Sequence, residues 1–269
     1  MKFPFIIIAL VVLLSSCSKN EQYSNMDIKA FGHGGSGNQS TLPMNSLESM
    51  LACYHAGGEG NELDLQLTKD SVLIAMHSSE LAENTNLKGK VNSMTWTEIE
   101  NGYYTENPYL KYKIVSLEQV LQYMGSFKNY YFTLDCKLYQ SETEQYNEVF
   151  SNQLASIINK YDLTNRVFIE SDNEAFLQLL KAKNNLLRLF IYTGSIADGI
   201  LICEKNAFYG ITISTRNATK EEIQQVHAKN LKVAIWNTHT KKDNKEAVEK
   251  GPDFIQTEKI SYLLSLLSK

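Results

Sequence analysis

The sequence predicts an α/β protein whose strands and helices form a single (β/α)8 barrel of the TIM type. Apolar, strand-like runs alternate with helical patterns along most of the chain, and eight of these runs can be counted. Repeated strand–helix alternation predicts a parallel sheet, and eight repeats predict that the sheet closes into a barrel. The roughly 240 residues that follow the N-terminal segment suit one barrel better than two small domains.

The expected strands are short runs in which apolar residues dominate. They cover residues 28–33, 62–67, 130–135, 167–170, 187–192, 209–213, 233–236 and 254–256. Residues 71–77 form an extra run, which we expect to pair with the second strand as a hairpin.

Helical periodicity separates these strands. It covers residues 46–57, 116–124, 143–160, 173–183, 220–229 and 260–267. Cys203 also falls in a helical segment, and Lys241, Lys242 and Lys245 indicate the solvated start of another helix.

An insertion at residues 78–115 interrupts the alternation and has few periodic apolar positions. A long loop on the active-site face of a barrel commonly carries function. Its aromatic residues either shape a substrate rim or pack the insertion on itself, and the sequence leaves both possibilities open. These residues are Trp96, Tyr103, Tyr104, Tyr109 and Tyr112.

The N-terminus has the pattern of a secretory signal of the lipoprotein kind. Residues 1–17 combine a lysine, a short apolar stretch and small residues just before Cys17. The apolar stretch is shorter than the roughly 20 residues that a transmembrane helix needs. We therefore expect a lipidated Cys17, a flexible tether at residues 18–26 and a barrel at residues 27–269, held on a membrane of the cell envelope and facing the periplasm or the cell surface. An ordinary cleaved signal is the alternative.

Composition argues against some partners and some kinds of structure. The net charge is −4 and no basic cluster is present, which argues against nucleic acid as a partner. Apart from Cys17, the cysteines are odd in number and none has metal-ligand spacing. A disulfide framework is therefore not expected; Cys53 and Cys203 are expected to be buried free thiols, and Cys136 to face away from Asp135 and Lys137.

Two histidines bracket two carboxylates in one short part of the chain. His33 and His77 each end an apolar run, and Glu62 and Asp64 lie between them. Because side chains alternate along a strand, both carboxylates project to the same face, where they can share one divalent cation. The C-terminal ends of barrel strands form the active-site face, so all four groups should meet in one mouth.

These groups suit the cleavage of a phosphodiester. A cation neutralises the charge that grows on the phosphoryl oxygens, and two histidines can remove one proton and deliver another. Ligation by oxygen atoms favours Mg²⁺ or Ca²⁺ over Zn²⁺. Which histidine is the base stays open.

The order and spacing of these motifs resemble the glycerophosphodiester phosphodiesterase family over about residues 28–260. The resemblance rests on His-Gly at position 33, Pro43-x-Asn45-Ser46, Glu62-x-Asp64-x-x-Leu67-Thr68-x-Asp70, the strand ending in His77, Leu81 and Thr85, Leu134-Asp-Cys-Lys137, Trp236 and the closing segment 251–258.

The resemblance implies roles for further residues. Asp135 stands where the family has a third acidic metal ligand, and Lys137 where it has a lysine. A salt bridge to Lys137 is the alternative role for one of the carboxylates. Trp236 is expected to form an apolar wall for the leaving alcohol, and Glu170 to join the metal shell or bind substrate. His239 could reach the mouth as an accessory group. In this family a substrate hydroxyl attacks phosphorus first, and water then opens the cyclic phosphate.

Three positions depart from the family pattern. Gly34 replaces the usual arginine, Met44 the usual glutamate and Ser78 the usual aspartate. Lys137 then becomes the main positive side chain for phosphate, while the backbone amide of Gly34 could approach an anion. Asp135 in place of glutamate is similar to the related phospholipase D-like toxins.

The sequence therefore predicts a metal-dependent phosphodiesterase that hydrolyses glycerophosphodiesters derived from lipid head groups. One alternative is a cyclising lyase on lysophospholipid, sphingolipid or inositol-type head groups. The other is a catalytically impaired phosphodiester-binding lipoprotein, suggested by Gly34 and Met44.

Overall fold

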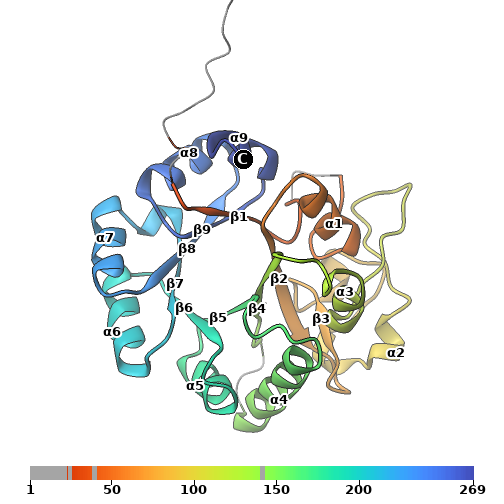
Figure 1. Cartoon of the computed structure of the whole chain (residues 1–269). Coiled ribbons are helices and arrows are strands. Elements are labelled where there is room, and N and C mark those ends of the chain that lie inside the picture. Colours follow the sequence, from red (N-terminus) through yellow and green to blue (C-terminus); the bar gives the residue numbers. More distant parts are fainter. Residues whose placement is uncertain (1–22, 24–25, 38–40, 140–142) are drawn as a thin grey trace, which may run out of the picture.

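The strands form a closed barrel. The computed structural model describes residue 23 and residues 26–37, 41–139 and 143–269. Pairing of the first strand with both the last and the second closes a ring of eight parallel strands, which Figure 1 shows surrounded by helices. The strands are β1 (Lys29–Gly32), β2 (Gly60–Leu67), β3 (Leu73–Ala75), β4 (Tyr131–Cys136), β5 (Val167–Ser171), β6 (Arg188–Tyr192), β7 (Gly210–Ser214), β8 (Lys232–Thr238) and β9 (Phe254–Thr257).

The helices follow the expected alternation. They are α1 (Leu47–His55), α2 (Trp96–Ile99), α3 (Leu117–Met124), α4 (Glu144–Lys160), α5 (Glu174–Lys183), α6 (Ile196–Asn206), α7 (Lys220–Ala228), α8 (Lys241–Lys250) and α9 (Ile260–Leu266). The six helices predicted with both ends are confirmed to within a few residues. The sequence also indicated helices at Cys203 and at Lys241 without giving their bounds, and these are α6 and α8. Polar N-cap side chains fix most starts; Ser46 accepts from the amide of Ser49 before α1, for example. The predicted (β/α)8 barrel is therefore confirmed.

The extra strand pairs as predicted. β3 runs antiparallel to β2, with Leu65 opposite Ala75 and Leu67 opposite Leu73. This hairpin carries the chain back along β2, so that His77 follows β3 at the same end of the barrel as the carboxyl end of β4.

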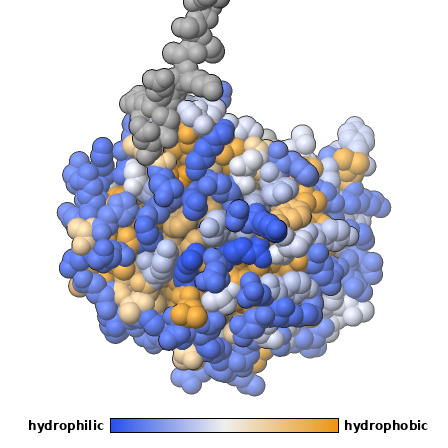
Figure 2. Space-filling view, in the orientation of Figure 1, coloured by the Kyte–Doolittle hydropathy of each residue, from blue (hydrophilic) through white to orange (hydrophobic). Residues whose placement is uncertain are grey.

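Two kinds of side chain fill the inside of the barrel. An aromatic residue precedes the polar residue on the same face of several strands, at Phe168 before Glu170, Phe254 before Gln256 and Tyr131 before Asp135. The aromatic residues cluster with Phe31, Phe190 and Ala234 in a core separate from the one beneath the helices. This aromatic layer closes the barrel below a polar mouth. Figure 2 shows the opposite face, at the amino-terminal ends of the strands, where hydrophilic residues also gather over the centre of the ring.

The insertion packs largely on itself. Tyr104 is buried in a small core with Leu81, Ile99 and Ile114, and Trp96 and Tyr112 pack against the same group. Figure 1 places this segment outside the ring, beside β3. Tyr109 is exposed. Self-packing, rather than a substrate rim, therefore accounts for most of the aromatic residues there.

Cys17 and nearly all of the expected tether lie outside the described residues. Within the tether, Tyr23 is buried and donates a hydrogen bond to Glu249 of α8, with 2.7 Å between the oxygens. Among the residues that the structure describes, no helix is long and apolar enough to cross a membrane. Cys53, Cys136 and Cys203 are buried free thiols, as predicted for Cys53 and Cys203.

The aromatic layer gives a test of the barrel's stability. Phe168 is 3% exposed, and its ring centroid lies 4.7 Å from that of Phe254 and 5.7 Å from that of Tyr131. We expect Phe168→Ala to lower the free energy of unfolding by about 3–5 kcal/mol, because it opens a cavity that the closed ring cannot collapse. Urea unfolding measures this, with Phe168→Leu as the milder control. A loss for Phe168→Ala no larger than that for Phe168→Leu would contradict a tightly packed layer.

Candidate active site

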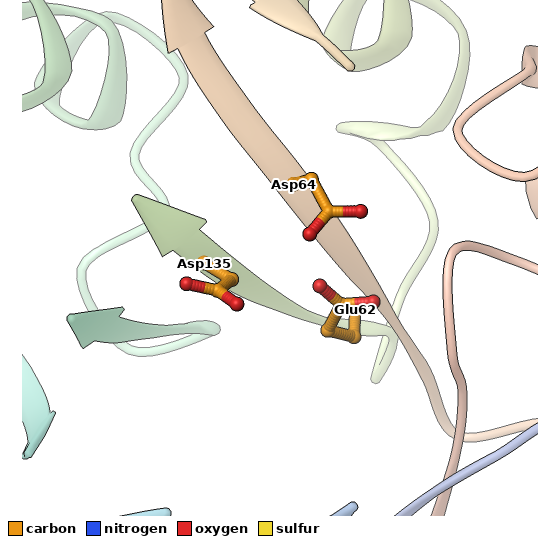
Figure 3. Close-up of side chains that lie close together, drawn as sticks. All are labelled: Glu62, Asp64 and Asp135. Carbon is orange, nitrogen blue, oxygen red and sulfur yellow. The ribbon is translucent and has the colours of Figure 1, made fainter. Parts of the chain in front are cut away.

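Three carboxylates meet at the mouth of the barrel. β2 carries Glu62 and Asp64 on one face, and the register of β2 with β4 sets Asp64 opposite Asp135. One oxygen of each lies within 4.8 Å of the others (Figure 3). Glu62 and Asp64 are almost fully buried, whereas Asp135 is partly open to the cavity. The structure thus brings together the three predicted metal ligands.

Lys137 lies among these carboxylates. Its Nζ is 2.6 Å from Asp135 Oδ2 and 3.0 Å from Asp64 Oδ1, so the salt bridge considered as an alternative exists with two of the three. Burial would lower the pKa of this ammonium group, but the surrounding carboxylates outweigh burial and raise it. One lysine balances only part of the charge of three carboxylates, so the salt bridge does not replace a role in metal binding.

The pKa shifts show where positive charge is missing. Burial, reinforced by repulsion from Asp64, raises the pKa of Glu62 well above its usual value. Burial also raises the pKa of Asp135. For Asp64 the effect of burial is outweighed by Lys137 and the nearby histidines, and its pKa is lowered. Because the cluster consists of oxygen donors and Lys137 balances only part of its negative charge, it fits a divalent metal ion.

Neighbouring groups hold the carboxylates in place. Asn45 Nδ2 donates to Asp64 Oδ2 at 2.7 Å, and the amide of Asp64 donates back to Asn45 Oδ1 at 3.0 Å. The backbone N–H of Gly34 donates to Glu62 Oε2 at 2.8 Å. This bond corrects our expectation for Gly34, whose amide is directed at a carboxylate and not at a substrate anion. The role of Asn45 was not predicted, although its motif was visible in the sequence.

His33 and His77 lie at one cavity. They follow β1 and β3, and both line a space of about 400 Å³ together with Glu62, Asp135 and Lys137. Gln66, which shares a face of β2 with the carboxylates, donates to the carbonyl of His77 at 3.1 Å. The strand that carries the carboxylates thus also positions the second histidine.

Glu258 links His33 to His239. Glu258 Oε1 lies 2.7 Å from His239 Nδ1 and 3.6 Å from His33 Nδ1. Burial would lower the pKa of His33, but Glu258, Glu62 and Asp64 outweigh burial and raise it to about 9. Sequence reasoning gave Glu258 no role, although it ends the closing motif.

Glu170 also lines the cavity, is almost fully buried and does not join the three-carboxylate group. Its Oε1 accepts hydrogen bonds from Thr212 Oγ1 at 2.7 Å and Gln256 Nε2 at 2.8 Å. Burial, together with repulsion from Asp135, raises the pKa of Glu170 to about 7. Of its two predicted roles, this placement favours contact with substrate.

Trp236 forms a wall of the same cavity. Its ring centroid lies 5.6 Å from that of Tyr192, a residue that sequence reasoning did not select. The buried Nε1 of Trp236 has no hydrogen-bond partner among the described residues. The wall therefore offers an apolar face.

Two departures from the family pattern occupy the same space. A Cβ added to Gly34 would lie 2.5 Å from Met44 Cε, and the φ of Gly34 is +58°. Met44 thus fills the volume that a side chain at position 34 would enter. The third departure, Ser78, is bonded to Asn84 of the insertion, with 3.0 Å between the two side-chain oxygens.

Comparison with known proteins agrees with this geometry. Residues 33–261 match the sequence profile of the glycerophosphoryl diester phosphodiesterase family. The chain belongs to this family. It is 26% identical over 236 residues to a glycerophosphodiester phosphodiesterase of Bacillus altitudinis, covering 86% of this chain and 94% of that one. It is 24% identical over 241 residues to one of Caldanaerobacter subterraneus subsp. tengcongensis, covering 87% and 96%.

Solved structures share the fold. A glycerophosphodiester phosphodiesterase of Parabacteroides distasonis superposes with a TM-score of 0.78 at 19% identity, covering 90% of this chain and 98% of that one. A phosphodiesterase of Oleispira antarctica, solved with its product sn-glycerol-3-phosphate, gives a TM-score of 0.77 at 17% identity, covering 90% and 97%. The chain is accordingly a glycerophosphodiester phosphodiesterase-like hydrolase.

The pKa of Glu170 predicts a pH-dependent stability. An acid whose pKa rises from 4.5 to about 7 on folding keeps its proton longer in the folded state, so wild-type stability falls as pH rises through that window. Glu170→Gln removes this loss and still accepts from Thr212 and Gln256. We expect the variant's advantage in free energy of unfolding to grow to at most about 3 kcal/mol between about pH 5 and pH 8.

Urea unfolding of both proteins across this range, in the presence of a chelator, measures the difference. An advantage that does not change with pH would mean that the Glu170 carboxyl ionises as readily in the folded protein as in the unfolded one.

Proposed function

We propose that this enzyme hydrolyses glycerophosphodiesters derived from lipid head groups, releasing an alcohol and glycerol phosphate. The observation that carries the proposal is the placement of two histidines and three carboxylates around one cavity. A metal ion supplies charge neutralisation at the phosphoryl group, and the histidines supply the two proton transfers that phosphodiester cleavage needs. Glu62, Asp64 and Asp135 would hold that ion, and their oxygen donors suit Mg²⁺ or Ca²⁺.

The shape of the site supports a substrate with two arms. A second hollow of about 340 Å³ shares His33 and His77 with the main cavity and is bordered by Met44, Asn84 and Tyr104. A phosphodiester has one ester group on each side of phosphorus. The two hollows would therefore hold its two alcohols, with phosphorus near the histidines.

The histidines would act in turn. One takes the proton of the attacking substrate hydroxyl as its oxygen bonds to phosphorus, and the other protonates the leaving oxygen as the phosphorus–oxygen ester bond breaks. In the second step the roles reverse: the histidine that gave its proton activates water, and the first returns its proton to the hydroxyl as the cyclic phosphate opens. Lys137 is placed to attract the negative phosphate.

Glu170 and Trp236 would contact the rest of the substrate. Glu170 presents a buried carboxyl to the cavity and can accept a hydrogen bond from a substrate hydroxyl. Trp236 gives the alcohol an apolar wall. Such a pairing of a hydrogen-bonding carboxyl with an aromatic face suits a polyol such as glycerol.

The first test follows the products by phosphorus NMR. The detergent-solubilised chain should convert a glycerophosphodiester to glycerol phosphate, a chelator should stop the reaction, and Mg²⁺ or Ca²⁺ should restore it. His33→Ala and His77→Ala should each lower kcat by about 10²-fold to 10⁴-fold, because each removes one proton transfer. The control is His55→Ala, which changes an exposed residue on α1 and should leave kcat unchanged.

Other results would point to the alternatives. A cyclic phosphate that persists as the final product would identify a lyase, and binding of diesters without turnover would identify an impaired enzyme. Unchanged turnover in His33→Ala would exclude the role proposed for this histidine.

We also propose that a lipidated Cys17 holds the enzyme on a membrane surface of the cell envelope. Cys17 precedes the buried Tyr23 by six residues. Six residues span at most roughly 20 Å, so the barrel would stay near the bilayer whose lipids would supply its substrates. The apolar run before Cys17 and the small residues beside it support the proposal.

Cys17→Ser tests the anchor. The wild-type protein should incorporate labelled fatty acid and sediment with membranes, because the acyl chains on Cys17 supply about 0.8 kcal/mol of membrane affinity per buried CH₂. The variant lacks these chains and should do neither. Membrane association that is unchanged in the unlabelled variant would exclude lipidation at this cysteine as the anchor.

A further inference from the structure

We propose that His239 is a positioning residue for the reaction: it holds the carboxylate of Glu258 beside His33 and so fixes the orientation of the His33 imidazole. The inference rests on the proposed catalytic role of His33. It concerns residues at the ends of three strands that neighbour one another in the closed barrel, since His33 follows β1, His239 follows β8 and Glu258 follows β9.

The distances define the direction of support. His239 Nδ1 lies 2.7 Å from Glu258 Oε1, which is a hydrogen bond, whereas His33 Nδ1 lies 3.6 Å from the same oxygen. A carboxylate only accepts, so the imidazole N–H of His239 is the donor. The shorter contact therefore fixes the carboxylate, and the longer one sets the distance between this carboxylate and His33.

The surroundings of Glu258 leave it little freedom. Its side chain is 4% exposed, and a Cβ added to Gly37 would lie 2.4 Å from Glu258 Cα. Gly37, with a φ of +83°, thus allows the loop after β1 to pack directly on Glu258. A buried carboxylate without a firm donor is costly, and His239 provides that donor.

Fixing Glu258 has a consequence for His33. The carboxylate lies 3.6 Å from His33 Nδ1, the distance of an ion pair and not of a hydrogen bond, and its charge favours a proton on that nitrogen, which leaves Nε2 to exchange protons on the other side of the ring. His33 lines the cavity, so its Nε2 faces away from Glu258, toward the place proposed for the substrate. The same logic orients the histidine of other carboxylate–histidine pairs.

His239 does not act on substrate directly. It lines neither the main cavity nor the second hollow, and it is not part of the three-carboxylate group. Its side chain is 37% exposed, and its contact with Glu258 connects it to His33. We therefore expect the effect of His239 on turnover to pass through Glu258.

Substitutions at His239 separate positioning from mere packing. Asn places an amide N–H at the same distance along the side chain as Nδ1 of histidine, whereas Leu fills similar volume without a donor. In the full chain we expect His239→Leu to lower kcat about tenfold with KM nearly unchanged, and His239→Asn to retain most of the wild-type kcat. Glu258→Gln should resemble His239→Leu.

The control is another histidine–carboxylate pair far from the cavity in the fold. His227 Nε2 on α7 lies 2.9 Å from Asp253 Oδ2, and neither residue lines the main cavity. His227→Leu should leave kcat unchanged, which shows that losing such a pair is not harmful in itself.

A second readout does not depend on turnover. Nitrogen-15 NMR of the His33 ring, recorded well above its pKa of about 9 so that the ring is neutral, should show the proton on Nδ1 in the wild-type protein and in His239→Asn, but a mixture of tautomers in His239→Leu. Unchanged kcat and an unchanged His33 spectrum in His239→Leu would overturn the inference, as would an equal loss in His239→Asn. If the wild-type enzyme cleaves no glycerophosphodiester, the proposed function fails, while the spectra still decide whether His239 orients His33.

Discussion

The constraint on which the site depends is the repulsion among three carboxylates held within 4.8 Å of one another at a barrel mouth. Such a group is unfavourable unless positive charge and hydrogen-bond donors compensate it. Lys137 contacts two of the three, Asn45 bonds to Asp64, and the Gly34 amide bonds to Glu62. The compensation comes from three different segments, so folding of the barrel itself assembles the environment that a cation completes.

The closed ring of strands is what makes this arrangement possible. Register sets Asp64 opposite Asp135 and Asp135 opposite Glu170, so acidic side chains from successive strands reach one height in the barrel. Beneath them, Phe31, Phe168 and Phe254 fill the interior and exclude water from below. Stability and chemistry are therefore divided along each strand, with apolar residues early and reactive residues late.

The sequence predicts those features that local patterns encode. Strand and helix alternation gives the barrel, and the spacing of Glu62 and Asp64 gives their shared face. The link from His33 through Glu258 to His239 could not be predicted, because residues more than 200 positions apart meet only when β1 pairs with β9. The bounds of α8 could not be predicted, because this helix buries few apolar side chains, chiefly Ala247 and Val248, and so has little apolar periodicity.

The contact between Gly34 and Met44 bears on whether the departures from the family pattern weaken the site. Replacing the family's arginine with Gly34 alone would leave an empty space beside position 34. Met44 occupies this space, and the Gly34 amide donates a hydrogen bond to Glu62. Among the described residues that line the main cavity, Lys137 is the only lysine or arginine. The positive charge at phosphate would then come from Lys137, a bound cation and a protonated histidine. We therefore interpret the site as rearranged. Gly34, Met44 and Ser78, which differ from the family pattern, each contact another residue of the site or the insertion. His33 and His77 remain at the cavity.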